Sequence, residues 1–237
     1  MSNSPKKHRT SRRDFLKATA VVSASGLVLA NASQIMSQTP AAQVSQRPKV
    51  QGTETEKNLL KAFAGESQAR NRYTYYADQA RKDGFQQIAA IFEETADHER
   101  EHAKRFFSHL KGGNLEIMAP YPAGFVGDTE ENLLAAAEGE HEEWAILYPE
   151  FAKIASDEGF PDIAQLFQNV CIAEKMHERR YRKLLKNIED GFVFERPQKV
   201  VWQCRNCGYI SEGVEPHASC PACAFPQSYF QIFPENW

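Results

Sequence analysis

Apolar residues in the middle of the chain recur with the spacing of a helix face. They follow the pattern i, i+3, i+4, i+7 twice, at Phe85, Ile88, Ala89 and Phe92 and again at Phe160, Ile163, Ala164 and Phe167. Both stretches belong to a repeat across residues 53–191, in which residues 57–66 match residues 131–140. The spacing indicates amphipathic helices, and the repeat predicts two helical hairpins.

Signals for helix ends divide each copy of the repeat in two. Residues 53–56 and 128–131 have the form of capping boxes, which open the first and third helices. Gly84 and Gly159 fit the short turns that end those helices. Residues 112–127, rich in glycine and proline, predict a long crossover. Two hairpins joined by one long connection predict an all-α, ferritin-like four-helix bundle.

Acidic and imidazole side chains continue the apolar face of this bundle. Each copy has a glutamate on its first helix and a Glu-x-x-His motif on its second, and residues three apart share a helix face. The motif begins fourteen residues after the first apolar residue of each stripe, which is about four helical turns. Buried charges are costly unless they are paired or bind metal. The residues are Glu66, Glu99, His102, Glu140, Glu174 and His177.

This combination of residues is the ligand set of ferritin-like di-iron bundles. From residue 53 to 237 the chain also resembles rubrerythrins, most clearly at residues 64–73 and 99–104. The resemblance implies two irons in the bundle and assigns their ligands as Glu66, Glu99, His102, Glu140, Glu143, Glu174 and His177.

Glu143 breaks the repeat, because its counterpart in the first copy is Ala69. The second copy also has one more residue between its ligand glutamate and its turn glycine than the first copy. Together with Pro149 inside the helix, this extra residue predicts a π-bulge or a kink. By resemblance, one iron exchanges Glu143 for His102 when the pair is reduced.

The repeat gives weaker evidence for the roles of several other residues. The resemblance implies that Tyr73 and Tyr148 hydrogen-bond the carboxylates, with ordinary core tyrosines as the alternative. Cys171 is interpreted as a small, buried apolar residue. Three histidines have no counterpart in the other copy and are predicted to lie at the surface or rim: His98, His109 and His141.

Residues 199–237 form a tail of different composition, with two Cys-x-x-Cys pairs, Cys204, Cys207, Cys220 and Cys223. Two such pairs, separated by twelve residues, predict a tetrahedral four-sulfur metal site. Four thiolates accept either zinc or iron. The aromatic surroundings resemble a rubredoxin domain, although Phe225 stands where family members often have histidine. The resemblance implies a small metal-binding β domain that carries one redox iron. The neighbouring di-iron bundle favours iron, because zinc cannot pass electrons.

The N-terminus resembles a twin-arginine export signal. Arg12 and Arg13 precede a short run of small and apolar residues, 18–30, and a possible cleavage site follows. A basic tail before a membrane helix is the alternative, although the run is short for a membrane span. Residues 1–32 are therefore predicted to direct export to a periplasmic or extracytoplasmic location, and residues 33–52 to form a flexible linker.

The charge of the chain excludes one class of partner. Residues 1–32 hold six of the 28 basic residues and one of the 31 acidic residues, so the remainder carries a formal charge of −8. An acidic chain without a basic stripe has little with which to neutralise phosphates. No nucleic-acid partner is expected.

These features predict a di-iron peroxidase that reduces hydrogen peroxide to water. The four-cysteine iron would re-reduce the pair with electrons from a donor that the sequence does not identify. By resemblance, the chain forms a homodimer or a larger homo-oligomer. Two alternatives stay open: a ferroxidase that handles iron as substrate, which would not need the cysteine domain, and a non-enzymatic metal-binding module with a structural zinc.

Overall fold

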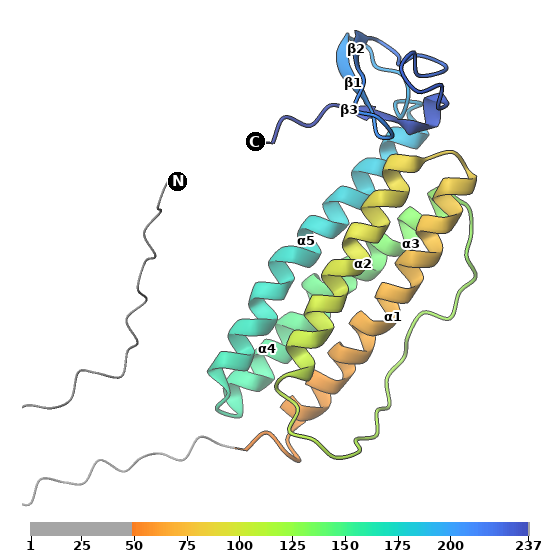
Figure 1. Ribbon diagram of the computed structural model, residues 1–237. Helices are drawn as coiled ribbons and strands as arrows, with labels where there is room; N and C mark the ends of the chain where they lie inside the picture. The colour runs from red at the N-terminus through yellow and green to blue at the C-terminus, as the bar shows by residue number, and fades with distance from the viewer. Residues whose placement is uncertain (1–48, 237) are drawn as a thin grey trace, which may run out of the picture. The chain divides into compact units, whose positions relative to one another are not determined.

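The computed structural model describes residues 49–236 (Figure 1). The predicted export signal and most of the predicted linker lie outside these residues. Val50, at the end of that linker, is buried and packs into the apolar core, so the folded part begins before Thr53. No helix among the described residues combines the length and apolar composition that crossing a membrane requires.

The predicted four-helix bundle is confirmed, with its third helix built from three segments. α1 packs along α2, and the third helix packs along α5. The crossover from α2 to α3 returns along the outside of the bundle (Figure 1). The helical segments are α1 (Glu54–Lys82), α2 (Gln86–Phe107), α3 (Thr129–Glu142), η1 (Glu143–Leu147), α4 (Tyr148–Asp157) and α5 (Pro161–Glu189).

The extra residue of the second copy is accommodated in η1, a π-helical segment that begins at Glu143. This confirms the predicted π-bulge. A π turn takes up one more residue than an α turn, so the helix keeps its buried face on both sides of the insertion. Glu140 before η1 and Tyr148 after it are both buried.

The two predicted capping boxes differ. The box at residues 128–131 is complete. At the start of α1, the Thr53 side chain accepts a hydrogen bond from Glu56 N, but the Glu56 carboxylate accepts from Gly52 N rather than from Thr53 N. The reason is the turn before the helix, in which Thr53 N already donates to Val50 O. The predicted box is therefore half formed.

The apolar core of the bundle consists of two clusters, one containing Phe92 and the other Phe167. The predicted ligands lie where one cluster gives way to the other. On α1, for example, Glu66 lies between Ala62 of one cluster and Ala69 of the other. The bundle therefore carries a polar layer with apolar packing on either side along the helices.

The tail forms a small three-stranded antiparallel sheet, as the fold prediction requires. Its strands are β1 (Val200–Cys204), β2 (Ile210–Gly213) and β3 (Phe230–Ile232), in the order β2-β1-β3, and a short 3-10 helix, η2 (Gln227–Tyr229), precedes β3. Trp202 and Phe230 are buried with Cys204 and Cys220 in a separate core. This core holds the two cysteine loops against the sheet.

Candidate metal centres

Two groups of metal-binding side chains share residues in the bundle. In each group, the ligand atoms lie within 4.8 Å of one another. Glu99 and Glu174 belong to both groups, which therefore form one site with two metal positions and two shared carboxylates. The first group is Glu66, Glu99, His102 and Glu174, and the second is Glu99, Glu140, Glu174 and His177.

Buried oxygen atoms without hydrogen bonds show that this site suits metal ions. The four glutamates are at most 1% exposed. Within residues 49–236, Oε2 of Glu66, Oε1 of Glu99, Oε2 of Glu140 and both carboxylate oxygens of Glu174 have no hydrogen-bond partner. Burying unpaired carboxylate oxygens is costly, whereas shared cations would satisfy all of them. Carboxylate and imidazole donors together suit iron.

Both histidines direct Nδ1 at the shared carboxylates. Nδ1 of His102 lies 2.8 Å from Oε1 of Glu174 and 3.0 Å from Oε2 of Glu99. Nδ1 of His177 lies 2.7 Å from Oε2 of Glu174 and 3.2 Å from Oε1 of Glu99. Despite these short distances, Nδ1 of His177 makes no aligned hydrogen bond. This geometry arises when the ring nitrogen and the carboxylate oxygens all point toward a common position between them, as metal ligands do, rather than toward one another.

Two buried tyrosines hold the outer carboxylates, as the resemblance implied. The Tyr73 hydroxyl donates to Oε1 of Glu140 at 2.5 Å, and the Tyr148 hydroxyl donates to Oε1 of Glu66 at 2.6 Å. In both carboxylates the other oxygen, Oε2, is the one without a partner. Each tyrosine therefore orients its carboxylate and leaves one oxygen to bind metal.

Glu143, the remaining predicted ligand, lies in neither group. It is half-buried at the start of η1, with Oε1 close to Gly65, where an added Cβ would lie 3.8 Å away. Together with Tyr121 and Tyr148 it lines a cavity of about 340 Å³ between α1, the crossover and the third helix. The cavity is large enough for a small molecule such as peroxide.

Without metal, the site binds protons instead. Burial raises the pKa of Glu66 well above its usual value, and the charge of Glu174 raises it further. Burial also raises the pKa of Glu140, followed by the charge of Glu99. Burial lowers the pKa of His102, but the close Glu174 and Glu99 carboxylates outweigh burial and raise that pKa to about 10. Metal uptake must therefore release protons.

The sequence did not indicate the contact that His98 makes. Its side chain is exposed, as predicted, but its Nδ1 lies 3.1 Å from Nε2 of His177. The counterpart of His98 in the second copy is Ala173, so the repeat gave no sign of this contact. Its place directly before Glu99 was the one available clue.

The other residues that the sequence singled out lie outside the metal-binding groups. His141 is exposed and lies 3.2 Å from Glu178, and His109 is half-buried. Cys171 is also half-buried rather than fully buried, and burial raises the pKa of its thiol to about 11. A thiol that stays protonated at neutral pH is a weak nucleophile.

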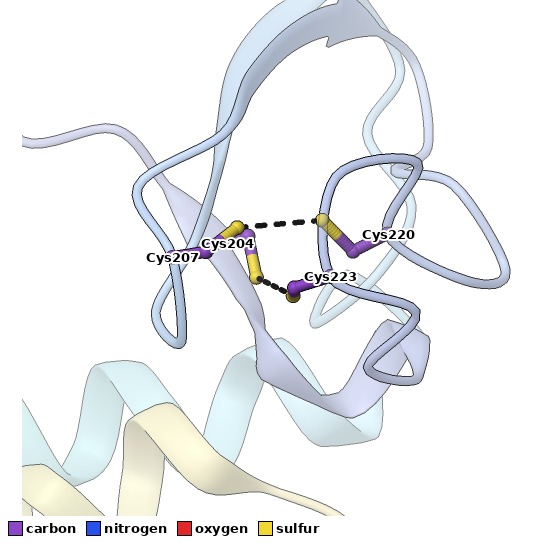
Figure 2. A group of neighbouring side chains, drawn as sticks. All are labelled: Cys204, Cys207, Cys220 and Cys223. Atoms are coloured by element: carbon purple, nitrogen blue, oxygen red, sulfur yellow. Dashed lines mark hydrogen bonds between the residues drawn. The ribbon is translucent and has the colours of Figure 1, made fainter.

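The four cysteines of the tail form a second centre (Figure 2). Their sulfur atoms, carried on two loops, point toward one another and lie within 4.8 Å. Cys204 Sγ is 3.8 Å from Cys223 Sγ, and Cys207 Sγ is 3.6 Å from Cys220 Sγ. A disulfide needs about 2 Å. A tetrahedral metal with bonds of ~2.3 Å separates its sulfurs by about 3.8 Å, so the distances fit a metal site.

The two cysteine loops contain the same kind of backbone turn. Gly208 N donates to Cys204 O, and Ala224 N donates to Cys220 O, both at 2.8 Å. Both donors have positive φ, +80° at Gly208 and +61° at Ala224. The left-handed conformation suits glycine and strains alanine, because alanine has a Cβ.

We therefore expect opposite effects from exchanging these two residues. Ala224→Gly should stabilise the tail by about 1 kcal/mol, and Gly208→Ala should destabilise it by a similar amount. Around Gly208 an added Cβ meets nothing within 4 Å, so backbone strain is the main cost. The measurement is the guanidinium midpoint at which the metal–thiolate absorption is lost. Shifts in the same direction would contradict the strain at Ala224.

Comparison with known proteins identifies both parts of the chain. The rubrerythrin family matches residues 57–185, and the rubredoxin-like domain of rubrerythrin matches residues 202–231. Rubrerythrin of Porphyromonas gingivalis is 56% identical over 188 residues, which cover 79% of this chain and 94% of that protein. Rubrerythrin of Nitratidesulfovibrio vulgaris is 54% identical over 188 residues, covering 79% of this chain and 98% of that protein.

A solved structure agrees with the sequence matches. Nigerythrin in a mixed-valence state has a TM-score of 0.51 and 28% sequence identity, and the match covers 85% of this chain and all of that one. The likeness therefore extends over the bundle and the cysteine domain together.

Proposed function

This chain belongs to the rubrerythrin family, which joins a di-iron carboxylate bundle to a four-cysteine domain, and we propose that it reduces hydrogen peroxide to water. Membership of the family supports an oxidoreductase. Peroxide as the oxidant is our proposal. The observation that carries it is the pair of metal positions sharing Glu99 and Glu174, in a chain that also holds a thiolate centre.

Reduction of hydrogen peroxide to two waters consumes two electrons and two protons. Two bound ferrous ions would supply both electrons and the Lewis acidity that weakens the O–O bond. Glu99 and Glu174 set the spacing of the two positions, and Tyr73 keeps one outer carboxylate turned inward. Glu143 can hold one proton at the cavity wall, because burial raises the pKa of its carboxyl group well above the usual value.

The position of Glu143 also fits the proposed redox cycle. In the structure His102 lies with the ligands and Glu143 lies outside them. The resemblance assigns this arrangement to the reduced pair. On oxidation, the greater positive charge would favour the anionic Glu143 over the neutral imidazole.

Glu143→Ala should fold and bind two irons, but it should reduce peroxide about tenfold more slowly or worse. The physical reason is that the oxidised pair loses an anionic ligand, which also raises its reduction potential. Iron content, potential and peroxide rate are measured on Glu143→Ala and on Glu142→Ala, an exposed neighbour that should match the parent. If both variants match the parent, Glu143 takes no part in the redox cycle.

Metal analysis tests the redox role of the cysteine domain. We expect about three irons per chain, two in the bundle and one between the four cysteines. Zinc between the cysteines would undermine electron transfer through the tail and favour a structural role. A ferroxidase would not need this domain at all.

We also propose that the chain acts as a homodimer or a larger homo-oligomer. Met118 and Phe125 on the crossover are 94% and 80% exposed. Large apolar side chains in such positions are commonly covered by a partner, and a second subunit is the partner proposed here. Sedimentation of the full chain measures the association.

Export is proposed from the N-terminal sequence, and it requires an electron donor outside the cytoplasm. Changing Arg12 and Arg13 together to lysine should keep the protein in the cytoplasm with its metals bound, because all predicted ligands lie beyond residue 65. Cell fractionation with metal analysis measures this. Continued export of the variant would show that another route or a membrane anchor reads the segment.

A further inference from the structure

The two histidines of the bundle site differ in the contacts of Nε2, the ring nitrogen that does not face the shared carboxylates. Nε2 of His177 is 3.1 Å from Nδ1 of His98, and the two rings are inclined by only 12°. The ring centroids are 5.3 Å apart, 2.2 Å more than the two nitrogens. That excess is close to two ring radii, so the two nitrogens lie nearly on the line between the rings and face each other.

The direction of this hydrogen bond follows from the other nitrogen of His177. Its Nδ1 faces Glu174 at 2.7 Å, Glu99 at 3.2 Å and Glu140 at 3.6 Å, where metal would bind. A metal ligand needs its lone pair, so a neutral ring must carry its proton on Nε2. Nε2 therefore donates, and Nδ1 of His98 accepts.

The neighbouring cation cannot replace His98 as the acceptor. Arg180 follows His177 by three residues on α5, and its guanidinium donates to Glu94 and Thr95. A guanidinium has no acceptor atom. Among residues 49–236, His98 is the side chain hydrogen-bonded to Nε2 of His177.

His102 has no corresponding support. Its Nδ1 also faces the shared carboxylates, but among the described residues no side chain is hydrogen-bonded to its Nε2. The residue at the place of His98 in the other copy is Ala173, which has no acceptor on its side chain. The side chain of His102 is 18% exposed, against 5% for His177. Among the described residues, the ring of His177 is therefore held through both of its nitrogens, whereas a side chain contacts the ring of His102 through Nδ1 alone.

We propose that His98 is a positioning residue that fixes the tautomer and orientation of His177, and thereby makes the Glu140–His177 position the tighter of the two metal positions. Such support behind a metal-bound histidine typically contributes about 10–100-fold in metal affinity. The inference requires the metal site and does not depend on peroxide as the substrate.

The test titrates the full chain with Co²⁺, which serves as a spectroscopic probe for both bundle positions. Cobalt bound by the four cysteines has its own thiolate charge-transfer absorption and is counted separately. The parent should bind two cobalt ions in the bundle in two resolved steps. His98→Ala should weaken the tighter step about 10–100-fold and leave the weaker step unchanged.

A conservative variant and a neighbour serve as controls. His98→Gln offers an amide oxygen as acceptor and should restore much of the tighter step, whereas Asp97→Ala, at an exposed neighbour, should match the parent. Proton NMR of the cobalt protein should show a slowly exchanging imidazole N–H from His177 that His98→Ala loses. Retention of both the tighter step and this N–H in His98→Ala would overturn the proposal. So would equal weakening of both steps.

Discussion

Replacing Cys204 and Cys207 together with serine should end continuous peroxide reduction but leave a single round intact. The change removes two of the four sulfurs of the tail, whereas every predicted ligand of the bundle lies on the helices. The pre-reduced pair should therefore still be oxidised once by peroxide. It should not be reduced again, because in the proposed cycle electrons reach the pair through the tail. The thiolate absorption should disappear, and the di-iron absorption should remain.

Stopped-flow absorption measures the single round, and continuous turnover is measured with a reductase that reduces the tail of the parent. A small chemical reductant is avoided, since it would reach the bundle directly. Cys171→Ser is the matched control, because it removes a thiol that belongs to neither centre. It should turn over like the parent. Undiminished continuous turnover in the double variant would refute electron transfer through the tail.

Metal removal should make the stability of the bundle fall as the pH rises above about 5. Glu66 and Glu140 have raised pKa values in the folded, metal-free bundle. Their contribution to its stability is therefore full below their ordinary pKa of about 4.5 and is lost as the pH rises through the raised values. His102 and His177 act in the same direction, with full stabilisation below 6.5 and loss through about 10 and 12. Glu174 has the opposite sign, but its contribution is lost only as the pH falls toward about 2.

In the loaded protein, metal takes the place of these protons, so its stability should depend much less on pH. A metal ion whose free concentration is 1,000 times its dissociation constant stabilises the fold by about 4 kcal/mol. Urea unfolding of loaded and metal-free protein at pH 5.5, 7 and 8.5 measures both effects. Glu66→Gln with Glu140→Gln should reduce the slope of the metal-free protein. Parallel pH profiles with and without metal would contradict the link between protons and metal.

The six residues of the two metal-binding groups were predictable because the repeat presents them twice in the same register. Carboxylates such as Glu99 and Glu174 lie on a face that is otherwise apolar, and the cost of burying them points to metal. The pattern could not show that these two residues are shared between the metal positions. Sharing depends on how α2 and α5 approach each other across the bundle, which no spacing within one helix records.

The π-helical segment was also predictable, from one extra residue and Pro149. The half-formed capping box at Thr53 was not, because the turn at Val50 takes up the backbone N–H that the motif assumes to be free. His98 was missed for a related reason. Its partner, His177, is 79 residues away on another helix, and the repeat has no second copy of the contact.

The most direct measurement of the central claim compares the two oxidants of the fully ferrous protein. Anaerobic protein is mixed with hydrogen peroxide, and separately with dioxygen, while the di-iron absorption and the released iron are followed. If the protein is a peroxide reductase, one equivalent of peroxide oxidises one iron pair, faster than dioxygen does, and the irons stay bound. Faster oxidation by dioxygen, with ferric iron released or accumulated beyond the two bundle positions, would contradict the account and indicate a ferroxidase.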